Sequence, residues 1–154
     1  MNSQLTVYKA SAGSGKTFTL AKEYMVLVIQ DPSSYRNILA VTFTNKATEE
    51  MKNRILSKLY GIANRLDDSR DYLEQIKGVL SQMSEEQIIE NAGIALKNLI
   101  HNYNYFRVET IDTFFQSVLR NLARELDLTA NLRIGLNDVQ IEEQAVDELI
   151  EELQ

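Results

Sequence analysis

Eight consecutive residues near the N-terminus have the small side chains, the lysine and the hydroxyl that phosphate binding requires. They are Ala10, Ser11, Ala12, Gly13, Ser14, Gly15, Lys16 and Thr17. Small residues let consecutive backbone N–H groups surround phosphate oxygens, and a helix that begins there adds the positive end of its dipole. Lys16 would neutralise the outer phosphates, and the Thr17 hydroxyl would be a ligand of Mg²⁺. The segment predicts a site for ATP and Mg²⁺ in which Lys16 and Thr17 have the catalytic roles.

This segment fits the Walker A pattern except at Ala10, where the first glycine is usual. Alanine is tolerable there if the backbone keeps a negative φ, because only a positive φ demands glycine. Before it, Leu5–Lys9 alternates apolar and polar residues, which predicts a short strand. After Lys16 the apolar residues recur at helical spacing, which predicts a helix that ends before Asp31. Strand, loop and helix follow in the order that a phosphate-binding loop requires.

Two further strands are predicted, and each is followed by a helix. Ile38–Phe43 is a continuous apolar run, typical of a strand buried on both faces of a parallel sheet, and a helix from about Ala47 to Leu66 comes next. Phe106–Thr110 is the other strand, and Ile111–Leu126 is the helix after it. The inner side of that last helix is predicted to carry Phe114, Phe115, Val118, Leu119, Leu122 and Ala123.

The remaining segments are predicted to be helical. Residues 67–104 show helical patterning around Tyr72–Met83 and Glu86–Ile100 without a convincing strand, which indicates a helical insertion. Asp138–Gln154 has the pattern of an amphipathic acidic helix. Alternating strands and helices predict an α/β fold with right-handed crossovers.

The composition is that of one soluble globular domain: 154 residues, of which 44% are apolar and 25% charged. The sequence has neither a membrane-length apolar run nor a signal peptide, so we expect a cytoplasmic protein without a membrane partner. Cysteine is absent and His101 is the one histidine. A thiolate site and a zinc site are therefore disfavoured, and magnesium is the expected metal.

The net charge of −6 disfavours a nucleic-acid partner, but the distribution of charge changes that interpretation. Asp138–Gln154 contains seven acidic and no basic residues, whereas Lys46–Arg65 has a surplus of three positive charges. Two interpretations of this basic segment stay open, a solvated helix face and a weak nucleic-acid surface.

Ile38–Ile55 resembles motif Ia of superfamily-one helicases of the UvrD/RecB type, and Val108–Gln116 resembles motif Ib. In that family both segments lie along single-stranded DNA. The resemblance implies that seven residues face DNA, namely Thr42, Phe43, Thr44, Asn45, Lys46, Thr110 and Phe114. Their hydroxyl, amide, ammonium and aromatic groups suit phosphates and stacked bases. Asp112 departs from the pattern, since many relatives carry histidine there and a carboxylate repels phosphate.

The resemblance also implies a domain organisation. Residues 1–126 would be an incomplete RecA-like P-loop NTPase domain, a parallel sheet with flanking helices and a helical insertion at about 67–104. Residues 127–154 would begin an inserted helical subdomain. The acidic pair and the arginine motifs with which these enzymes hydrolyse ATP are not found in the sequence. We therefore expect the chain as given to bind ATP without rapid turnover.

The implied parent is an ATP-dependent DNA helicase or exonuclease that acts in DNA repair and recombination. Its expected partners are single-stranded DNA and the remainder of the helicase or a nuclease subunit. Two alternatives stay open. One is a P-loop phosphotransferase. The other is a non-catalytic nucleotide-binding or assembly module, which could form a homodimer through an exposed edge of its sheet.

Overall fold

The computed structural model describes residues 15–125 of the chain. The predicted strand Leu5–Lys9, the loop residues Ala10–Ser14 and the predicted helix Asp138–Gln154 lie outside the described residues. The chain divides into two units, residues 1–111 and 112–154, and each is considered by itself.

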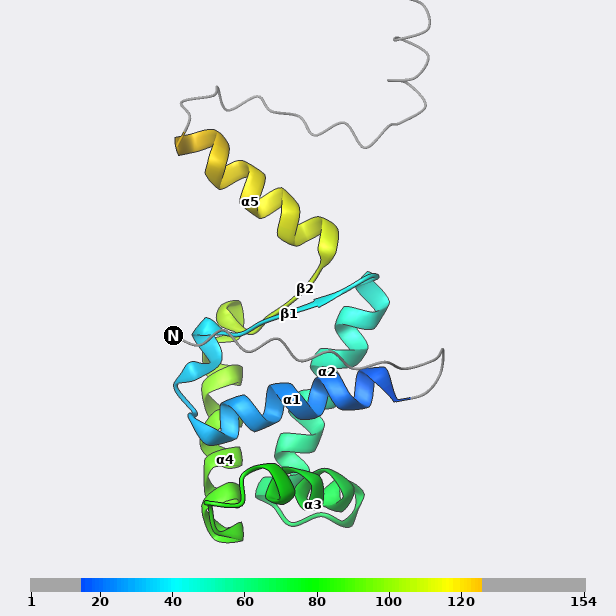
Figure 1. Ribbon diagram of the computed structural model, residues 1–154, viewed down its shortest axis with the longest axis vertical. Helices are drawn as coiled ribbons and strands as arrows, with labels where there is room; N and C mark the ends of the chain where they lie inside the picture. The colour runs from blue at the N-terminus through cyan, green and yellow to red at the C-terminus, as the bar shows by residue number, and fades with distance from the viewer. Residues whose placement is uncertain (1–14, 126–154) are drawn as a thin grey trace, which may run out of the picture. The chain divides into compact units, whose positions relative to one another are not determined.

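Helices alternate with two strands along the described residues (Figure 1). The elements are α1 (Lys16–Gln30), η1 (Ser34–Asn37), β1 (Leu39–Thr42), α2 (Asn45–Ala63), η2 (Asp67–Ser69), α3 (Arg70–Val79), α4 (Glu85–His101), η3 (Tyr103–Tyr105), β2 (Arg107–Thr110) and α5 (Ile111–Glu125). β1 and β2 pair in parallel, with Leu39 opposite Arg107 and Thr42 opposite Thr110. Parallel strands need a long crossover, which α2, α3 and α4 provide. The predicted α/β class is confirmed.

The predicted elements that fall on residues 15–125 are present, with small shifts at their ends. α1 ends at Gln30, and residues 67–104 form α3 and α4 without a strand, both as predicted. β1 is shorter by one residue at each end than predicted. Only Ala40 of β1 is buried, so its expected burial on both faces is not seen. None of the described helices combines the length and the apolarity needed to cross a bilayer.

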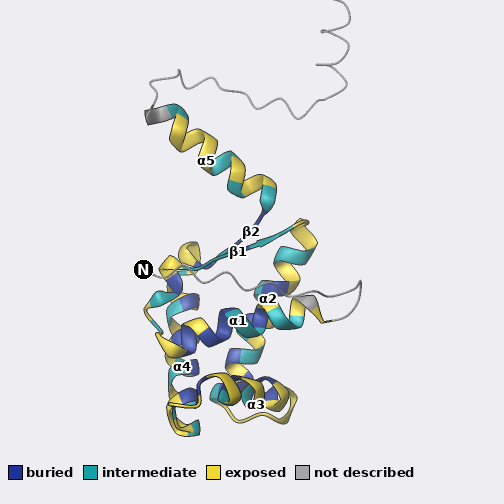
Figure 2. Cartoon of the chain, in the orientation of Figure 1, coloured by how far each residue is buried: buried dark blue, intermediate teal, exposed yellow. Residues whose placement is uncertain are grey.

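Three helices of the first unit, α1, α2 and α4, pack against one another around one apolar core. Figure 1 shows α1 lying across α2 and α4, and Figure 2 shows the buried residues on their inner faces. Fully buried side chains come from all three helices, including Met25, Ile29, Ile55, Leu59, Ile88 and Leu99. Burial of one such side chain contributes about 1.5–3 kcal/mol. The helices of residues 67–104 therefore share their core with α1 and α2.

α2 ends at Ala63, earlier than the predicted Leu66. Arg65 has a φ of 55°, and its N–H donates to the carbonyl of Ile62 at 3.1 Å. The N–H of Leu66 donates to the carbonyl of Gly61 at 2.8 Å. Together these bonds form a Schellman motif, which satisfies the last carbonyls of the helix and stops it. The apolar pattern continues through Leu66, so it does not reveal this stop.

α5 has its predicted bounds to within one residue, and from Asp112 onward it belongs to the second unit. Phe114 and Phe115 contact each other edge to face, with ring centroids 5.6 Å apart. Of the six residues predicted for the inner side, Phe114 and Ala123 are half-buried, while Phe115, Val118, Leu119 and Leu122 are 57%, 42%, 48% and 48% exposed. The helix is amphipathic as predicted, and four of the six residues expected on its inner side are exposed.

Candidate nucleotide and nucleic-acid site

α1 begins with a backbone conformation that glycine adopts far more readily than other residues. Gly15, its N-cap residue, has a φ of 79°, in the left-handed region. A Cβ at Gly15 would meet no atom within 4 Å, so the need for glycine comes from the backbone angle alone. Among the described residues of the predicted phosphate loop, Gly15 is thus the position that requires glycine.

The first turn of α1 has backbone N–H groups without acceptors inside the helix. The first helical bond runs from the N–H of Thr19 to the carbonyl of Gly15 at 2.8 Å. The N–H groups of Lys16, Thr17 and Phe18 come before that bond. Within residues 15–125, no side chain caps this end, and the first turn contains no acidic residue. Such open amides at the positive end of a helix dipole suit a phosphate group.

Helices α3 and α4 hold the two ends of α1. Near its beginning, the ring of Phe18 stacks on Tyr72 of α3, with centroids 4.2 Å apart. Near its end, the side-chain amide of Asn91 donates to the carbonyl of Ile29 at 2.8 Å. The side-chain amide of Asn98 donates to the carbonyl of Pro32, also at 2.8 Å. The direction in which the open amides of α1 point therefore depends on α3 and α4.

Tyr72, Asn91 and Asn98 were not singled out from the sequence. The sequence does contain a pattern from which the two asparagines could have been found. They stand seven residues apart, about two helical turns, on a segment otherwise patterned as an amphipathic helix. Two amides on one side of an apolar helix indicate polar partners at a helix end. For Tyr72 there was no such signal, because an aromatic residue at helical spacing is typical of any core.

Three threonines shape the loop between β1 and α2. The hydroxyl oxygens of Thr42 and Thr48 lie 2.6 Å apart, within hydrogen-bonding distance. Each of them also lies 3.2 Å from the carbonyl oxygen of Thr44. The Thr44 hydroxyl accepts a hydrogen bond from the N–H of Ala47 at 3.1 Å and caps α2. The hydroxyls of Thr42 and Thr44 are thus already engaged in holding the loop.

The same loop presents three other predicted residues to solvent. The Phe43 side chain is 86% exposed, an unusual state for an aromatic residue. Asn45 is exposed, and the Lys46 side chain is 86% exposed with its ammonium 4.0 Å from Glu50. An aromatic ring, an amide and a weakly paired ammonium suit base stacking and phosphate contact.

The structure brings six of the seven predicted DNA-facing residues to one end of the strand pair. Thr42 and Thr110 stand opposite each other at the carboxyl ends of β1 and β2. In open α/β sheets, ligands bind outside these ends. Thr110 is only 8% exposed, so its side chain is mostly buried. Phe114 belongs to the second unit and is not placed with this group.

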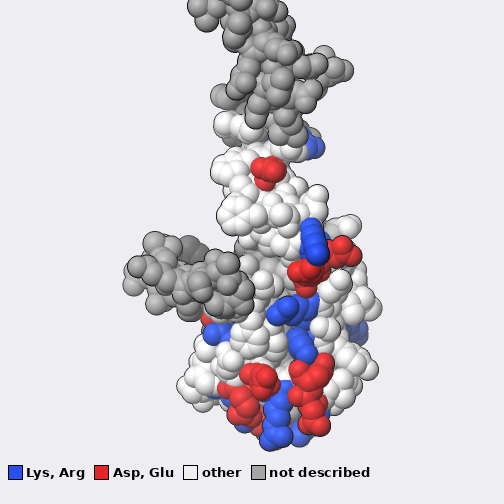
Figure 3. Space-filling view, turned by 90° about the vertical axis from the view of Figure 1, so that its right-hand side faces the viewer, with Lys and Arg blue, Asp and Glu red and all other residues white. Residues whose placement is uncertain are grey.

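Some of the positively charged side chains of α2 have partners within the chain. Lys58 donates to Asp68 at 3.0 Å, and this bond, together with one from Ser69, lowers the pKa of the Asp68 carboxyl. The ammonium of Lys52 lies over the ring of Tyr103 at 5.0 Å. Figure 3 shows basic and acidic side chains interleaved on the face in view rather than one continuous basic patch. The net positive charge that α2 offers to any polyanion is therefore smaller than the surplus of Lys46–Arg65 suggests.

Comparison with known proteins gives a family match over the whole chain. The family model described as the UvrD/REP helicase N-terminal domain matches residues 1–154. The chain is 32% identical over 148 residues to an ATP-dependent helicase/nuclease subunit of Thermoanaerobacter sp. (strain X514), and the match covers 94% of this chain and 10% of that relative.

Two further relatives are named as subunits of RecBCD. RecBCD enzyme subunit RecB of Haemophilus influenzae is 37% identical over 70 residues, 41% of this chain and 6% of that relative. RecBCD enzyme subunit RecB of Borreliella burgdorferi is 31% identical over 126 residues, 82% of this chain and 10% of that relative. The chain thus spans about a tenth of the length of these relatives, or less. No solved structure matches it.

Removal of the cap on α2 should destabilise the first unit. Thr44→Ala deletes the hydroxyl that accepts from Ala47, and we expect the free energy of unfolding to fall by about 1 kcal/mol. Thr44→Ser keeps an oxygen at that place and should stay within about 0.3 kcal/mol of the parent chain. Urea denaturation followed by circular dichroism measures both variants. Equal losses in the two would contradict the capping role.

Proposed function

Because the chain belongs to the UvrD/REP helicase N-terminal domain family, we propose that it is the ATP-binding portion of an ATP-dependent DNA helicase or helicase-nuclease. The observation that carries this proposal is the open first turn of α1, which begins at Gly15 with a left-handed backbone. That turn directly follows Ala10–Ser14, and together they complete the Walker A pattern apart from Ala10. The name of the Thermoanaerobacter relative, which describes an ATP-dependent helicase/nuclease, supports the same function.

In this proposal Ala10–Thr17 binds the phosphates of ATP. The N–H groups at the start of α1 donate to phosphate oxygens, and the Lys16 ammonium neutralises the outer phosphates. The Thr17 residue is exposed, and its hydroxyl serves as a ligand of Mg²⁺. When bound, the metal shields the charge of the phosphates. The proposed role of this chain is to bind and orient the nucleotide.

We also propose that the strand pair belongs to a larger RecA-like parallel sheet. The parallel pairing of β1 and β2 and their helical crossover support this. Residues 1–126 would form the P-loop domain, with 67–104 as its helical insertion, and 127–154 would begin a helical subdomain. The shared core of α1, α2 and α4 means that this insertion contributes to the stability of the domain itself.

The β1–α2 loop is the proposed contact with single-stranded DNA. Phe43 would stack on a base, while Asn45 and Lys46 would contact the backbone. Thr42 and Thr44 would act mainly by shaping the loop that presents these side chains, since their hydroxyls already have partners. Thr110, being mostly buried, would act through its backbone. Phe114 stays a proposed second stacking residue.

The proposed partners of the whole protein are DNA, the remainder of the helicase and a nuclease subunit, in DNA repair and recombination. Support comes from the names of the relatives, which describe subunits of a helicase/nuclease and of the RecBCD enzyme. The chain spans a tenth or less of these relatives. Translocation and strand cleavage are therefore proposed for the whole protein rather than for these residues alone.

Nucleotide with Mg²⁺ should raise the melting temperature of the chain. At ten times the dissociation constant, a ligand that binds only the folded state stabilises it by about 1.4 kcal/mol. We expect Lys16→Ala to abolish the shift in scanning calorimetry with ADP or ATP. Lys97→Ala, which removes an exposed lysine of α4, is the matched control and should keep the shift. No shift of the parent chain at millimolar nucleotide would rule out the proposed phosphate site.

Loss of the exposed phenylalanine should weaken DNA binding. Stacking contributes about 1–3 kcal/mol per base, so we expect Phe43→Ala to raise the dissociation constant for labelled oligo-dT about tenfold at low salt. Tyr60→Ala on α2, where Tyr60 is 55% exposed, is the matched aromatic control and should change little. Fluorescence anisotropy measures all three chains. If Phe43→Ala and Tyr60→Ala bind alike, the loop is not the DNA contact.

A further inference from the structure

Two tyrosines and two basic side chains form a surface cluster at the amino ends of the two strands. Arg36 belongs to η1, which leads into β1, and Tyr103 and Tyr105 belong to η3, which leads into β2. Lys52 of α2 lies over the ring of Tyr103 and completes this tyrosine cluster. Because β1 and β2 are parallel, the cluster lies at the end of the strand pair opposite to the loop proposed for DNA.

The guanidinium of Arg36 is held in place by two tyrosines. Its Nε–H donates to the hydroxyl of the buried Tyr35 at 2.9 Å. The guanidinium carbon lies 4.9 Å from the centre of the Tyr105 ring, which is a cation–π contact. The two terminal nitrogens carry four further N–H donors, and none of these has an acceptor among residues 15–125. Since Arg36 is exposed, it presents a fixed fork of donors to solvent.

Lys52 is held beside the other tyrosine in a similar way. Its ammonium lies 5.0 Å from the centre of the Tyr103 ring and 5.7 Å from the centre of the Phe106 ring. Tyr103 and Phe106 also contact each other edge to face, with centroids 5.9 Å apart. Tyr103 and Tyr105 are each 49% exposed. Two half-exposed rings, each with a cation beside it, therefore stand on one short turn.

The positive charges of the tyrosine cluster are not offset by carboxylates. Neither Arg36 nor Lys52 forms an ion pair with another residue in the part of the chain that the structure describes. Glu49 stands one turn before Lys52 on α2 without pairing with it. The carboxylate of Asp31, near η1, already accepts from the N–H and the hydroxyl of Ser33. The cluster therefore offers a net positive charge to a ligand.

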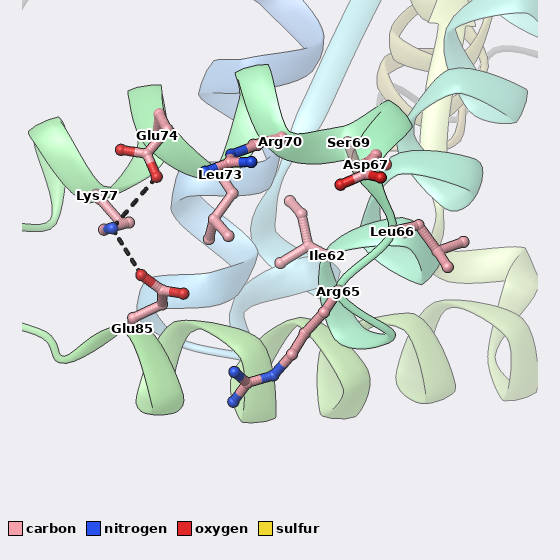
Figure 4. Close-up of a pocket in the computed structure, with 11 residues that line it drawn as sticks. Ile62, Arg65, Leu66, Asp67, Ser69, Arg70, Leu73, Glu74, Lys77 and Glu85 are labelled. Carbon is pink, nitrogen blue, oxygen red and sulfur yellow. Dashed lines mark hydrogen bonds and ion pairs between the residues drawn. The ribbon is translucent and has the colours of Figure 1, made fainter.

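The arginines that line the cavity between α2, η2, α3 and α4 differ in this respect (Figure 4). The charged side chains of that lining are three basic and three acidic ones, Arg65, Arg70, Lys77, Asp67, Glu74 and Glu85. Lys77 contacts Glu74 at 3.3 Å and Glu85 at 2.6 Å. The bond from Lys77 lowers the pKa of the Glu85 carboxyl, and the charges of Arg65 and Arg70 add to that effect. Charges of both signs balance in the cavity, whereas those of the tyrosine cluster do not.

We propose that the tyrosine cluster binds an acidic segment of a partner protein. One carboxylate accepts two parallel hydrogen bonds from Arg36, and a second accepts from Lys52. An apolar side chain between these carboxylates covers the exposed parts of Tyr103 and Tyr105. Tyrosine and arginine are enriched in protein–protein interfaces, and here they are already ordered, which lowers the entropy that binding costs. The proposal rests on the part of the proposed function that gives the whole protein a partner subunit.

Single-stranded nucleic acid fits this surface less well. A base needs an open ring face, and a cation already occupies one face of Tyr103 and one face of Tyr105. Affinity for nucleic acid also grows with the number of phosphates that are neutralised, and the cluster supplies only Arg36 and Lys52. An acidic peptide needs no open ring face, because its carboxylates bind the edges of the cations.

The test is an NMR titration of the 154-residue chain with the blocked tripeptides Glu-Leu-Glu and Gln-Leu-Gln. We expect Glu-Leu-Glu to shift the backbone amide signals of Arg36, Tyr103 and Tyr105, and to bind about tenfold more tightly than Gln-Leu-Gln. Arg36→Gln and Tyr105→Leu should each reduce that preference, because they remove the guanidinium and the ring that orients it. Arg54→Gln is the matched control, since Arg54 is exposed elsewhere on α2, and it should bind like the parent.

Three results would overturn the proposal. In the first, the two peptides act alike on these signals at millimolar concentration, or neither shifts them. In the second, Arg36→Gln and Tyr105→Leu are folded by their spectra and bind Glu-Leu-Glu like the parent. In the third, oligo-dT shifts the same signals at lower concentration than Glu-Leu-Glu does, which would make the cluster a nucleic-acid surface. Phe43→Ala should bind Glu-Leu-Glu like the parent, so failure of the proposed DNA contact can be distinguished from failure of this proposal.

Discussion

The placement of α1 is the constraint on which the rest of the site depends. An open helix N-terminus can bind phosphate only if the helix is held in one direction. In this chain, residues distant in the sequence fix the direction of α1. Asn91 and Asn98 of α4 bind carbonyls at and beyond the end of α1, and Tyr72 of α3 stacks on Phe18 near its beginning. Buried side chains of α1, α2 and α4 complete the attachment. The segment 67–104 therefore supports the first turn of α1, the proposed phosphate site.

In the loop after β1, some residues stabilise the backbone and others remain exposed to solvent. Thr42, Thr44 and Thr48 use their hydroxyls to close the loop and cap α2, so they stabilise a local geometry. Phe43 and Lys46 lie in the same loop and remain exposed to solvent. If this loop binds DNA as proposed, its aromatic side chain can meet a base without prior ordering of the backbone.

Much of this arrangement could be predicted from the sequence, because periodicity reports local structure well. The bounds of α1 and α5, the two parallel strands and the helical nature of 67–104 were predicted, and the helicase family expected from residues 38–55 and 108–116 is confirmed. Side-chain contacts between distant segments were not predicted. Nothing local in the sequence shows that Thr110 is buried, that Arg65 turns left-handed to end α2, or that Tyr72 meets Phe18.

The central claim is that the first turn of α1 receives the phosphates of a nucleotide. The most direct measurement is a two-dimensional ¹H–¹⁵N NMR titration of the chain with Mg²⁺·ADP. Hydrogen bonds to phosphate oxygens should move the amide signals of Gly15, Lys16, Thr17 and Phe18, while that of Leu99, in the core on α4, should stay in place. Unchanged signals from those four residues at millimolar Mg²⁺·ADP, in a chain that is folded, would contradict the account.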